Sequence, residues 1–226
     1  MGILRHVATG LSGPETHMAA LSGLLVQDTE GGLRLYSASG TGGGLLVRDA
    51  GLALQETESY GPSSGLDAPR FLVTTEIGGQ EMLLAPGRYG TRIEAWQLGA
   101  DGELGKRVEL TLAGAEPQAL LALETVQVAG QGYIVTASRQ SAGLEVWQAD
   151  GQTLRAQPQD VLAQAPGTGA VSAIDSLTLA GETRVLALSS SQNSLYSYVL
   201  GGDGRLTDVA RLDLQDGLFL DTPTRL

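Results

Sequence analysis

The sequence repeats with a period of about 51 residues, and this period constrains the fold more than any other feature. Three short segments align along the chain, and each ends in an aromatic residue: Arg92–Trp96, Gly143–Trp147 and Ser194–Tyr198. Trp96 and Trp147 are 51 residues apart, as are Trp147 and Tyr198. A fourth copy, Gly44–Arg48, lies 48 residues before the first. A fixed period of this length is typical of proteins that stack one small structural unit many times.

Each copy predicts four short antiparallel strands. In the third copy we expect strands at about 120–128, 133–138, 144–148 and 154–162. Asp-Gly dipeptides at Asp101, Asp150 and Asp203 separate the last two strands of three copies, and this dipeptide is the strongest short signal for a hairpin turn. No apolar stripe of helical period with caps competes with this interpretation.

Four antiparallel strands in a repeated unit of about 50 residues predict an all-β fold, a β-propeller of four-stranded blades. We place the four blades at about 17–59, 69–112, 119–162 and 171–214. A single blade has two apolar faces, and radial stacking buries both of them. The aromatic residue at the end of each third strand is then expected between neighbouring blades. A β-sandwich is the alternative architecture.

The blades do not complete a ring in this sequence. A strand at about 4–10 precedes the first blade and has no partner strands of its own, and residues 218–226 begin a further blade. We therefore expect an incomplete ring from a longer protein, and a four-bladed ring with one surplus strand is the alternative. An incomplete ring exposes blade faces through which the chain can associate with itself.

The composition excludes several classes of protein. The chain has 226 residues, with 14 basic and 25 acidic side chains and a net charge of −11, which argues against nucleic acid as a partner. It has no cysteine and two histidines, so disulfide scaffolds, thiolate zinc sites and histidine metal clusters are excluded. We identify no signal peptide and no membrane span. The expected location is extracellular, by export without an N-terminal signal, and the cytoplasm is the alternative.

Several phrases resemble repeats of bacterial hemolysin-type (RTX) calcium-binding proteins: Gly130–Ser138, Gly143–Trp147 and Gly202–Leu206. The blade is also similar to that of lactonase-type propellers, including 6-phosphogluconolactonase. In the hemolysin type a propeller-like region precedes tandem calcium repeats, so this resemblance implies a secreted protein. The nearest match to a calcium repeat, Gly201–Val209, is single and has Leu206 where the family has a liganding Asp. We therefore expect no cofactor in this chain, and calcium only in a C-terminal region outside it.

The candidate ligand-binding residues lie in loops that a propeller places at the mouth of its central channel. They are Arg88, Arg92, Arg139, Gln192 and Asn193. Arg88 and Arg139 occupy the same repeat position, and paired guanidinium groups can hold a carboxylate or a phosphate. The alternative is that these arginines are solvated, or paired with a nearby glutamate.

No residue is assigned a catalytic or metal-binding role. His6 and His17 have no partner that the sequence can identify. Asp101, Asp150 and Asp203 are interpreted as turn residues. Four glutamates could supply carboxylates to a lactonase-like channel: Glu15, Glu76, Glu116 and Glu124.

Together these features predict a non-catalytic β-propeller interaction module, part of a secreted calcium-repeat protein, that binds a protein or a glycan through its loops. One alternative is a lactonase-like hydrolase that uses the central channel. The other is an intracellular scaffold propeller.

Overall fold

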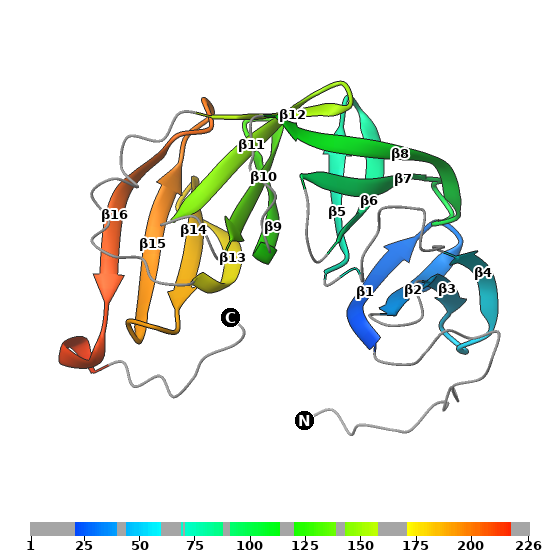
Figure 1. Cartoon of the computed structure of the whole chain (residues 1–226), viewed down its shortest axis with the longest axis horizontal. Helices are drawn as coiled ribbons and strands as arrows, with labels where there is room; N and C mark the ends of the chain where they lie inside the picture. Colours follow the sequence, from blue (N-terminus) through cyan, green and yellow to red (C-terminus); the bar gives the residue numbers. More distant parts are fainter. Residues whose placement is uncertain are drawn as a thin grey trace. The chain divides into compact units, whose positions relative to one another are not determined.

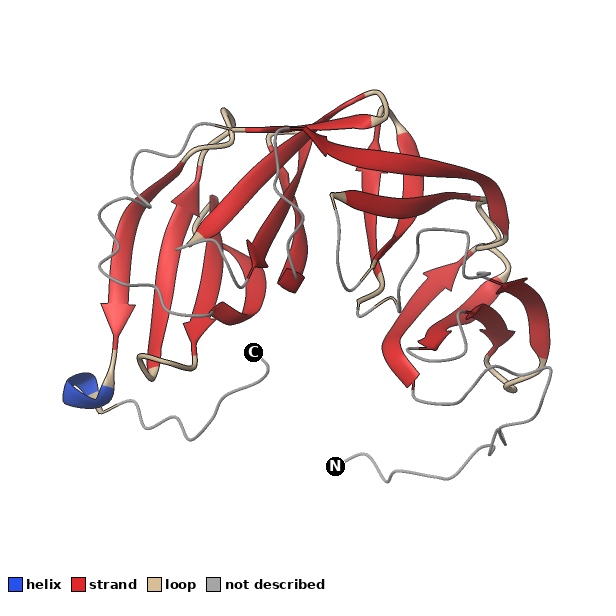
Figure 2. Ribbon diagram, in the orientation of Figure 1, coloured by secondary structure: helices blue, strands red, loops and turns tan. Residues whose placement is uncertain are grey.

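The computed structural model of this chain describes residues 21–39, 44–59, 69, 71–87, 91–113, 120–138, 143–157 and 171–217. Within these ranges the regular structure consists of sixteen strands and one 3-10 turn, η1 (Leu214–Asp216), as Figure 2 shows. The prediction of an all-β fold is confirmed. Among the same residues, no helix is long and apolar enough to cross a membrane.

The strands follow the four repeats, four strands to each. The first repeat holds β1 (Leu21–Thr29), β2 (Gly32–Ser39), β3 (Gly44–Asp49) and β4 (Leu54–Ser59). The second holds β5 (Val73–Ile77), β6 (Gln80–Pro86), β7 (Arg92–Leu98) and β8 (Leu104–Ala113). The third holds β9 (Leu120–Val128), β10 (Gln131–Ser138), β11 (Leu144–Asp150) and β12 (Thr153–Ala156). The fourth holds β13 (Val171–Leu179), β14 (Glu182–Ser189), β15 (Ser194–Leu200) and β16 (Leu206–Leu212).

The chain divides into two compact units. The first unit comprises Met1–Val73, Gln80–Arg88 and Glu94–Val108, and the second comprises Thr74–Gly79, Tyr89–Ile93 and Glu109–Leu226. The first unit contains the antiparallel sheet β1-β2-β3-β4, coloured blue to cyan in Figure 1. The second contains the antiparallel sheet β13-β14-β15-β16, coloured yellow to red, beside the strands β9 to β12.

The count of four separate blades is not confirmed. In the second unit the end of β8 pairs in parallel with β12, with Thr111 opposite Thr153, so that strands of two repeats belong to one sheet.

The last strand of the third repeat is also shorter than the predicted 154–162: β12 ends at Ala156. Pro158 follows two residues later and has no N–H to donate to a ladder, which explains the early end. The predicted strand at 4–10 and the segment 218–226 lie outside the described residues.

Each unit buries an apolar core between consecutive repeats. In the second unit the core joins side chains of β9–β11 with side chains of β13–β16: Ala122, Val126, Tyr133, Val135, Ala137, Leu144, Val146, Val171, Val185, Ala187, Tyr196, Tyr198, Leu200 and Leu206. In the first unit Trp96 packs with residues of the first repeat such as Tyr36 and Val47. The prediction that the aromatic residue of the third strand lies between repeats is therefore confirmed for Trp96 and Tyr198.

Three of the hairpin turns share one geometry. The amides of Leu52, Gly102 and Gly204 donate to the carbonyls of Asp49, Gly99 and Gly201, at 3.0, 2.9 and 3.0 Å. Each of the three donor residues has a positive φ, of 65°, 80° and 77°. The first of these turns has Leu at the left-handed position, which explains why no Asp-Gly signal marked it in the sequence.

The aspartates of the Asp-Gly dipeptides do not all have the same role. In the second and fourth repeats, Oδ1 of Asp101 accepts from the amide of Glu103 at 3.2 Å, and Oδ1 of Asp203 accepts from the amide of Arg205 at 3.1 Å. Their interpretation as turn residues is confirmed. Asp150 instead belongs to β11, and the β11–β12 hairpin closes through a tighter turn in which Asp150 lies opposite Thr153.

Two of the shared turns, those of the second and fourth repeats, also receive hydrogen bonds from the preceding repeat of their unit. The hydroxyl of Tyr36 donates to the carbonyl of Gly102 at 2.7 Å, and the hydroxyl of Tyr133 donates to the carbonyl of Gly202 at 2.6 Å. Nε of Arg34 donates to the carbonyl of Asp101 at 2.9 Å. The second strand of one repeat is thus tied to the last hairpin of the next.

Candidate functional site

The predicted channel-mouth arginines are only partly described. Arg88 and Arg139 lie outside the described residues. Arg92 is the first residue of β7, and its guanidinium pairs with the carboxylate of Glu109 at 3.2 Å. This ion pair matches the alternative given from the sequence, an arginine paired with a nearby glutamate. The grouping of the three arginines around an anion stays a prediction.

Gln192 and Asn193 lie in the turn between β14 and β15. The side-chain oxygen of Gln192 accepts a hydrogen bond from the hydroxyl of Tyr196, and its carbonyl accepts from the hydroxyl of Ser194 at 2.9 Å. Asn193 has a left-handed φ of 47°, a conformation that Asn tolerates better than most residues. Both residues therefore shape this turn, and any ligand role for them stays a prediction.

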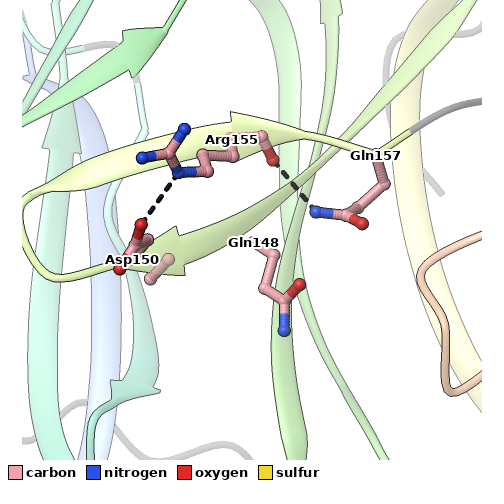
Figure 3. A pocket seen from close by; sticks show the side chains of 5 residues that line it. Gln148, Asp150, Arg155 and Gln157 are labelled. Carbon is pink, nitrogen blue, oxygen red and sulfur yellow. Dashed lines mark hydrogen bonds and ion pairs between the residues drawn. The ribbon is translucent and has the colours of Figure 1, made fainter.

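The second unit contains an open depression on the β11–β12 hairpin, with a volume of about 330 Å³. Its lining residues are Gln148, Ala149, Asp150, Arg155 and Gln157. Gln148 lies opposite Arg155 in the ladder, and side chains alternate between the faces of a strand, so the four polar residues share one face of the hairpin. Figure 3 shows these four side chains.

The groups of the depression make few contacts with one another. Nε of Arg155 donates to Oδ2 of Asp150 at 2.8 Å, and Nε2 of Gln157 donates to the carbonyl of Arg155 at 3.3 Å (Figure 3). The side chains of Asp150 and Arg155 are each 66% exposed. An exposed ion pair of this kind contributes at most about 1 kcal/mol, so its groups can reorient toward a ligand at little cost.

The β15–β16 hairpin of the fourth repeat approaches the edge of the depression. A Cβ at Gly204 would lie 2.7 Å from Cγ of Gln157 and 2.8 Å from Cε1 of Tyr133, so only glycine fits there. Gln157 is thereby held against the neighbouring hairpin. Sequence reasoning did not identify this depression. The signal that could have found it is the alternation of long polar side chains at 148, 150, 155 and 157.

Of the four glutamates proposed for a lactonase-like channel, the structure distinguishes Glu124. It lies half-buried on β9, and Oγ of Ser176, on β13, donates to its Oε1 at 3.0 Å. Burial raises the pKa of the Glu124 carboxyl; the Ser176 hydrogen bond opposes this shift, and the charge of Asp175 adds to it. Glu76 is exposed on β5. Glu15 and Glu116 lie outside the described residues.

A second carboxyl, Glu145 on β11, was not singled out by the sequence. Burial raises its pKa, and a hydrogen bond from Thr136 opposes the shift. Oγ1 of Thr136 also accepts from the indole N–H of Trp147 at 2.9 Å. Among the described residues, no group of three His, Cys, Asp or Glu side chains could hold a metal ion.

Comparisons of sequence identify no relative. No protein-family model matches the chain, and no curated protein matches it. The resemblance to hemolysin-type calcium-binding proteins therefore gains no support from them.

Comparisons of structure find similar folds. A candidate 6-phosphogluconolactonase from Bacteroides fragilis matches 98% of this chain with a TM-score of 0.58 and 18% identity. The periplasmic gluconolactonase PpgL of Pseudomonas aeruginosa matches 82% with a TM-score of 0.56 and 16% identity. BBS1N, in a structure of its complex with ARL6DN, matches 93% with a TM-score of 0.57 and 13% identity.

At these identities the likeness concerns the fold alone. The chain has an all-β, propeller-like fold similar to that of gluconolactonases, which confirms the lactonase-type part of the resemblance. It spans 61%, 52% and 63% of the length of the three matched chains.

Proposed function

We propose that this chain is a carbohydrate-binding module with a lactonase-like propeller fold, and that the depression on the β11–β12 hairpin is its binding site. The observation that carries this proposal is the gathering of Gln148, Asp150, Arg155 and Gln157 on one face of that hairpin, around an open volume of about 330 Å³. The proposal selects the glycan from the two partner classes, protein and glycan, that the sequence left open.

The chemistry of these four side chains fits a ligand rich in hydroxyl groups. Each glutamine amide offers two donors and an acceptor, the carboxylate accepts, and the guanidinium donates. A sugar hydroxyl both donates and accepts, so it can bridge such groups in a way that a purely anionic or purely apolar ligand cannot. The printed names of two similar structures concern sugar lactones, which supports this class of ligand.

Within the whole protein, we propose that the module is exported and that it requires no cofactor of its own. Calcium, where it is needed, binds to a region outside this chain. The intracellular scaffold is the competing assignment, and the location of the native protein, in the medium or in the cell, separates the two.

The binding proposal is tested with a panel of neutral mono- and oligosaccharides that includes gluconate and glucono-δ-lactone. Ligand-observed NMR and calorimetry should detect binding with a dissociation constant in the millimolar range or tighter. The double variant Gln148→Ala/Gln157→Ala should weaken it at least tenfold, because it removes both amides. Gln215→Ala, an exposed glutamine of the same unit on η1, is the matched control and should leave binding unchanged. Equal binding by all three proteins, or no binding of any sugar, would refute the assignment.

A lactonase-like hydrolase is the second candidate, and Glu124 is the observation that favours it. Because burial raises the pKa of this carboxyl, Glu124 retains its proton to a higher pH than an exposed glutamate does. In lactone hydrolysis, water adds to the ring carbonyl and the ring C–O bond breaks. A protonated carboxyl can supply the proton that the leaving oxygen requires.

This candidate is tested by following acid release from glucono-δ-lactone above the spontaneous rate. Glu124→Gln should abolish the excess rate, and Gln215→Ala, on the exposed turn η1, should leave it unchanged. A rate equal to that of buffer rules out this hydrolysis.

A further inference from the structure

The same dipeptide, Asp-Gly, lies in the last hairpin of three repeats, and the three turns hold it in different ways. These dipeptides begin at Asp101, Asp150 and Asp203. Asp-Gly converts readily to isoaspartate, because glycine has no side chain to hinder the approach of its amide to the aspartate carboxyl. A fourth dipeptide, Asp216–Gly217, borders residues outside the described part of the chain, so the comparison concerns the other three. Differences in reactivity among them come from the fold.

The conversion requires movement of two groups, the glycine amide and the aspartate carboxyl. The amide nitrogen attacks Cγ, a C–N bond forms, and the carboxyl hydroxyl leaves as water with the amide proton. Water then opens the succinimide ring. When water adds to the former peptide carbonyl, that C–N bond breaks, the chain continues through Cγ and the α-carboxylate becomes free. No other reactant takes part, and the product has the composition of the original chain.

The turns at Asp101 and Asp203 hold both groups. The amides of Gly102 and Gly204 donate to carbonyls within their own turns, at 2.9 and 3.0 Å. Oδ1 of each aspartate accepts from the amide two residues later, at 3.2 and 3.1 Å. At both sites these hydrogen bonds must break before the amide can reach Cγ.

A tyrosine of the preceding repeat also presses on each of these two turns. A Cβ at Gly102 would lie 2.7 Å from the hydroxyl oxygen of Tyr36, and this hydroxyl donates to the Gly102 carbonyl. A Cβ at Gly204 would lie 2.8 Å from Cε1 of Tyr133. The hydroxyl of Tyr133 donates to the carbonyl of Gly202. The preceding repeat thus opposes the opening that the reaction requires.

The turn at Asp150 holds neither group in this way. Among the described residues, the Gly151 amide finds no acceptor, and a Cβ at Gly151 would meet no atom within 4 Å. The Asp150 carboxylate pairs with the guanidinium of Arg155, and both side chains are 66% exposed (Figure 3). The neighbouring strand β8 contacts the turn one residue later, where the amide of Thr111 donates to the carbonyl of Gln152 at 3.0 Å. Asp150 and Gly151 themselves are exposed.

From these differences we propose that Asp150 is a site of spontaneous isoaspartate formation, whereas Asp101 and Asp203 are protected by their turns. A protected turn reacts only after it opens locally, and an exposed ion pair breaks at little cost. The product adds one methylene group to the main chain of a two-residue hairpin loop, so Asp150 no longer fits opposite Thr153. The modification changes the wall of the depression, and its formation does not depend on the carbohydrate proposal.

The proposal is tested by ageing the folded chain at neutral pH and constant temperature, followed by mapping of its tryptic peptides. Trypsin cleaves after Lys106, Arg155 and Arg205, so the three dipeptides fall into three different peptides. Isoaspartate is identified by a shifted elution at unchanged mass and by electron-transfer fragmentation. We expect it to accumulate about tenfold faster or more in the peptide of Asp150, because the other two turns must first open.

Three controls separate the fold from the local sequence. In urea, where the turns are lost, the three sites should convert at similar rates. In the folded chain, Tyr133→Phe removes the hydroxyl that binds the turn of the fourth repeat, so it should speed conversion at Asp203 and leave that at Asp150 unchanged. Gly151→Ala should slow conversion at Asp150, because a methyl group then hinders the approach of the amide.

Equal rates at the three sites of the folded chain would overturn the proposal, as would the absence of isoaspartate at Asp150. An excess at Asp150 that persists in urea would overturn it as well, because the local sequence would then be the cause. An unchanged rate at Asp203 in Tyr133→Phe would contradict protection by the turn.

Discussion

The third and fourth repeats carry a similar pattern on the same face, yet these two faces are not buried to the same extent. Val126 in β9 is 3% exposed, and Leu177, at the equivalent position of β13, is 40% exposed. Tyr133 donates to the next repeat, whereas Arg184, 51 residues later, is tied to acidic side chains of its own sheet. In the third repeat this face is buried by packing against the fourth repeat.

The largest expected effect comes from placing a charge on each of the two equivalent positions. Val126→Asp puts a carboxylate into a packed core and should lower the free energy of unfolding by more than about 3 kcal/mol. Leu177→Asp leaves its carboxylate in solvent and should cost less than about 1 kcal/mol. Urea denaturation followed by tryptophan fluorescence measures both values, at a concentration where the chain is monomeric. Similar losses in the two variants would mean that Leu177 is covered in solution.

The last hairpins of the third and fourth repeats also differ in how closely other side chains approach them. Gly204→Ala combines a positive φ of 77° with a Cβ only 2.7 Å from Gln157, so it should cost about 2–3 kcal/mol. Gly151→Ala in the β11–β12 turn has a φ of 62° and no atom within 4 Å, so it should cost about 1 kcal/mol. Thermal denaturation of the two variants against the wild type gives the comparison. If Gly151→Ala costs as much as Gly204→Ala, the close approach between the hairpins is not the cause.

A smaller effect concerns the carboxyl between the two repeats. Burial raises the pKa of Glu124 in the folded protein, so the folded protein holds this proton more tightly than the unfolded chain does. The stabilisation is full below the ordinary pKa of glutamate and is lost as the pH rises through the raised pKa. Glu124→Gln should therefore lose less stability than the wild type as the pH rises from the ordinary pKa of glutamate through the raised one. Two parallel stability curves over this range would show that Glu124 does not have the raised pKa.

The smallest effect is expected from removal of divalent metal. Treatment with EGTA should leave the thermal midpoint unchanged. The segment that resembles a calcium repeat, Gly201–Val209, forms the turn between β15 and β16 and the first part of β16. The Asp203 carboxylate accepts a hydrogen bond within this turn. Added calcium should likewise have no effect. A shift of several degrees in either experiment would assign a calcium site to this chain.

Much of the fold could be predicted because it depends on short-range patterns. The 51-residue spacing of Trp96, Trp147 and Tyr198 indicated the repeat, and the structure places Trp96 and Tyr198 between repeats as expected. The Asp-Gly signals at Asp101 and Asp203 indicated true turns. The parallel pairing of β8 with β12 was not predicted, because no local pattern specifies which distant strand edges meet.

The candidate site was harder to predict for the same reason. Of the predicted ligand residues, Arg92 pairs with a glutamate and Gln192 shapes a turn. Glu124 was one of four equal candidates in the sequence. It became distinct only through burial and the hydroxyl of Ser176, 52 residues away in the chain.

The sequence by itself determined the period, the strands and most of the turns, because alternation and turn chemistry act between residues that are close along the chain. Tertiary structure alone decided which equivalent faces are buried, which carboxyl has a raised pKa and which polar side chains line an open depression. These properties depend on groups brought together from different repeats, and similar local patterns therefore acquire different environments.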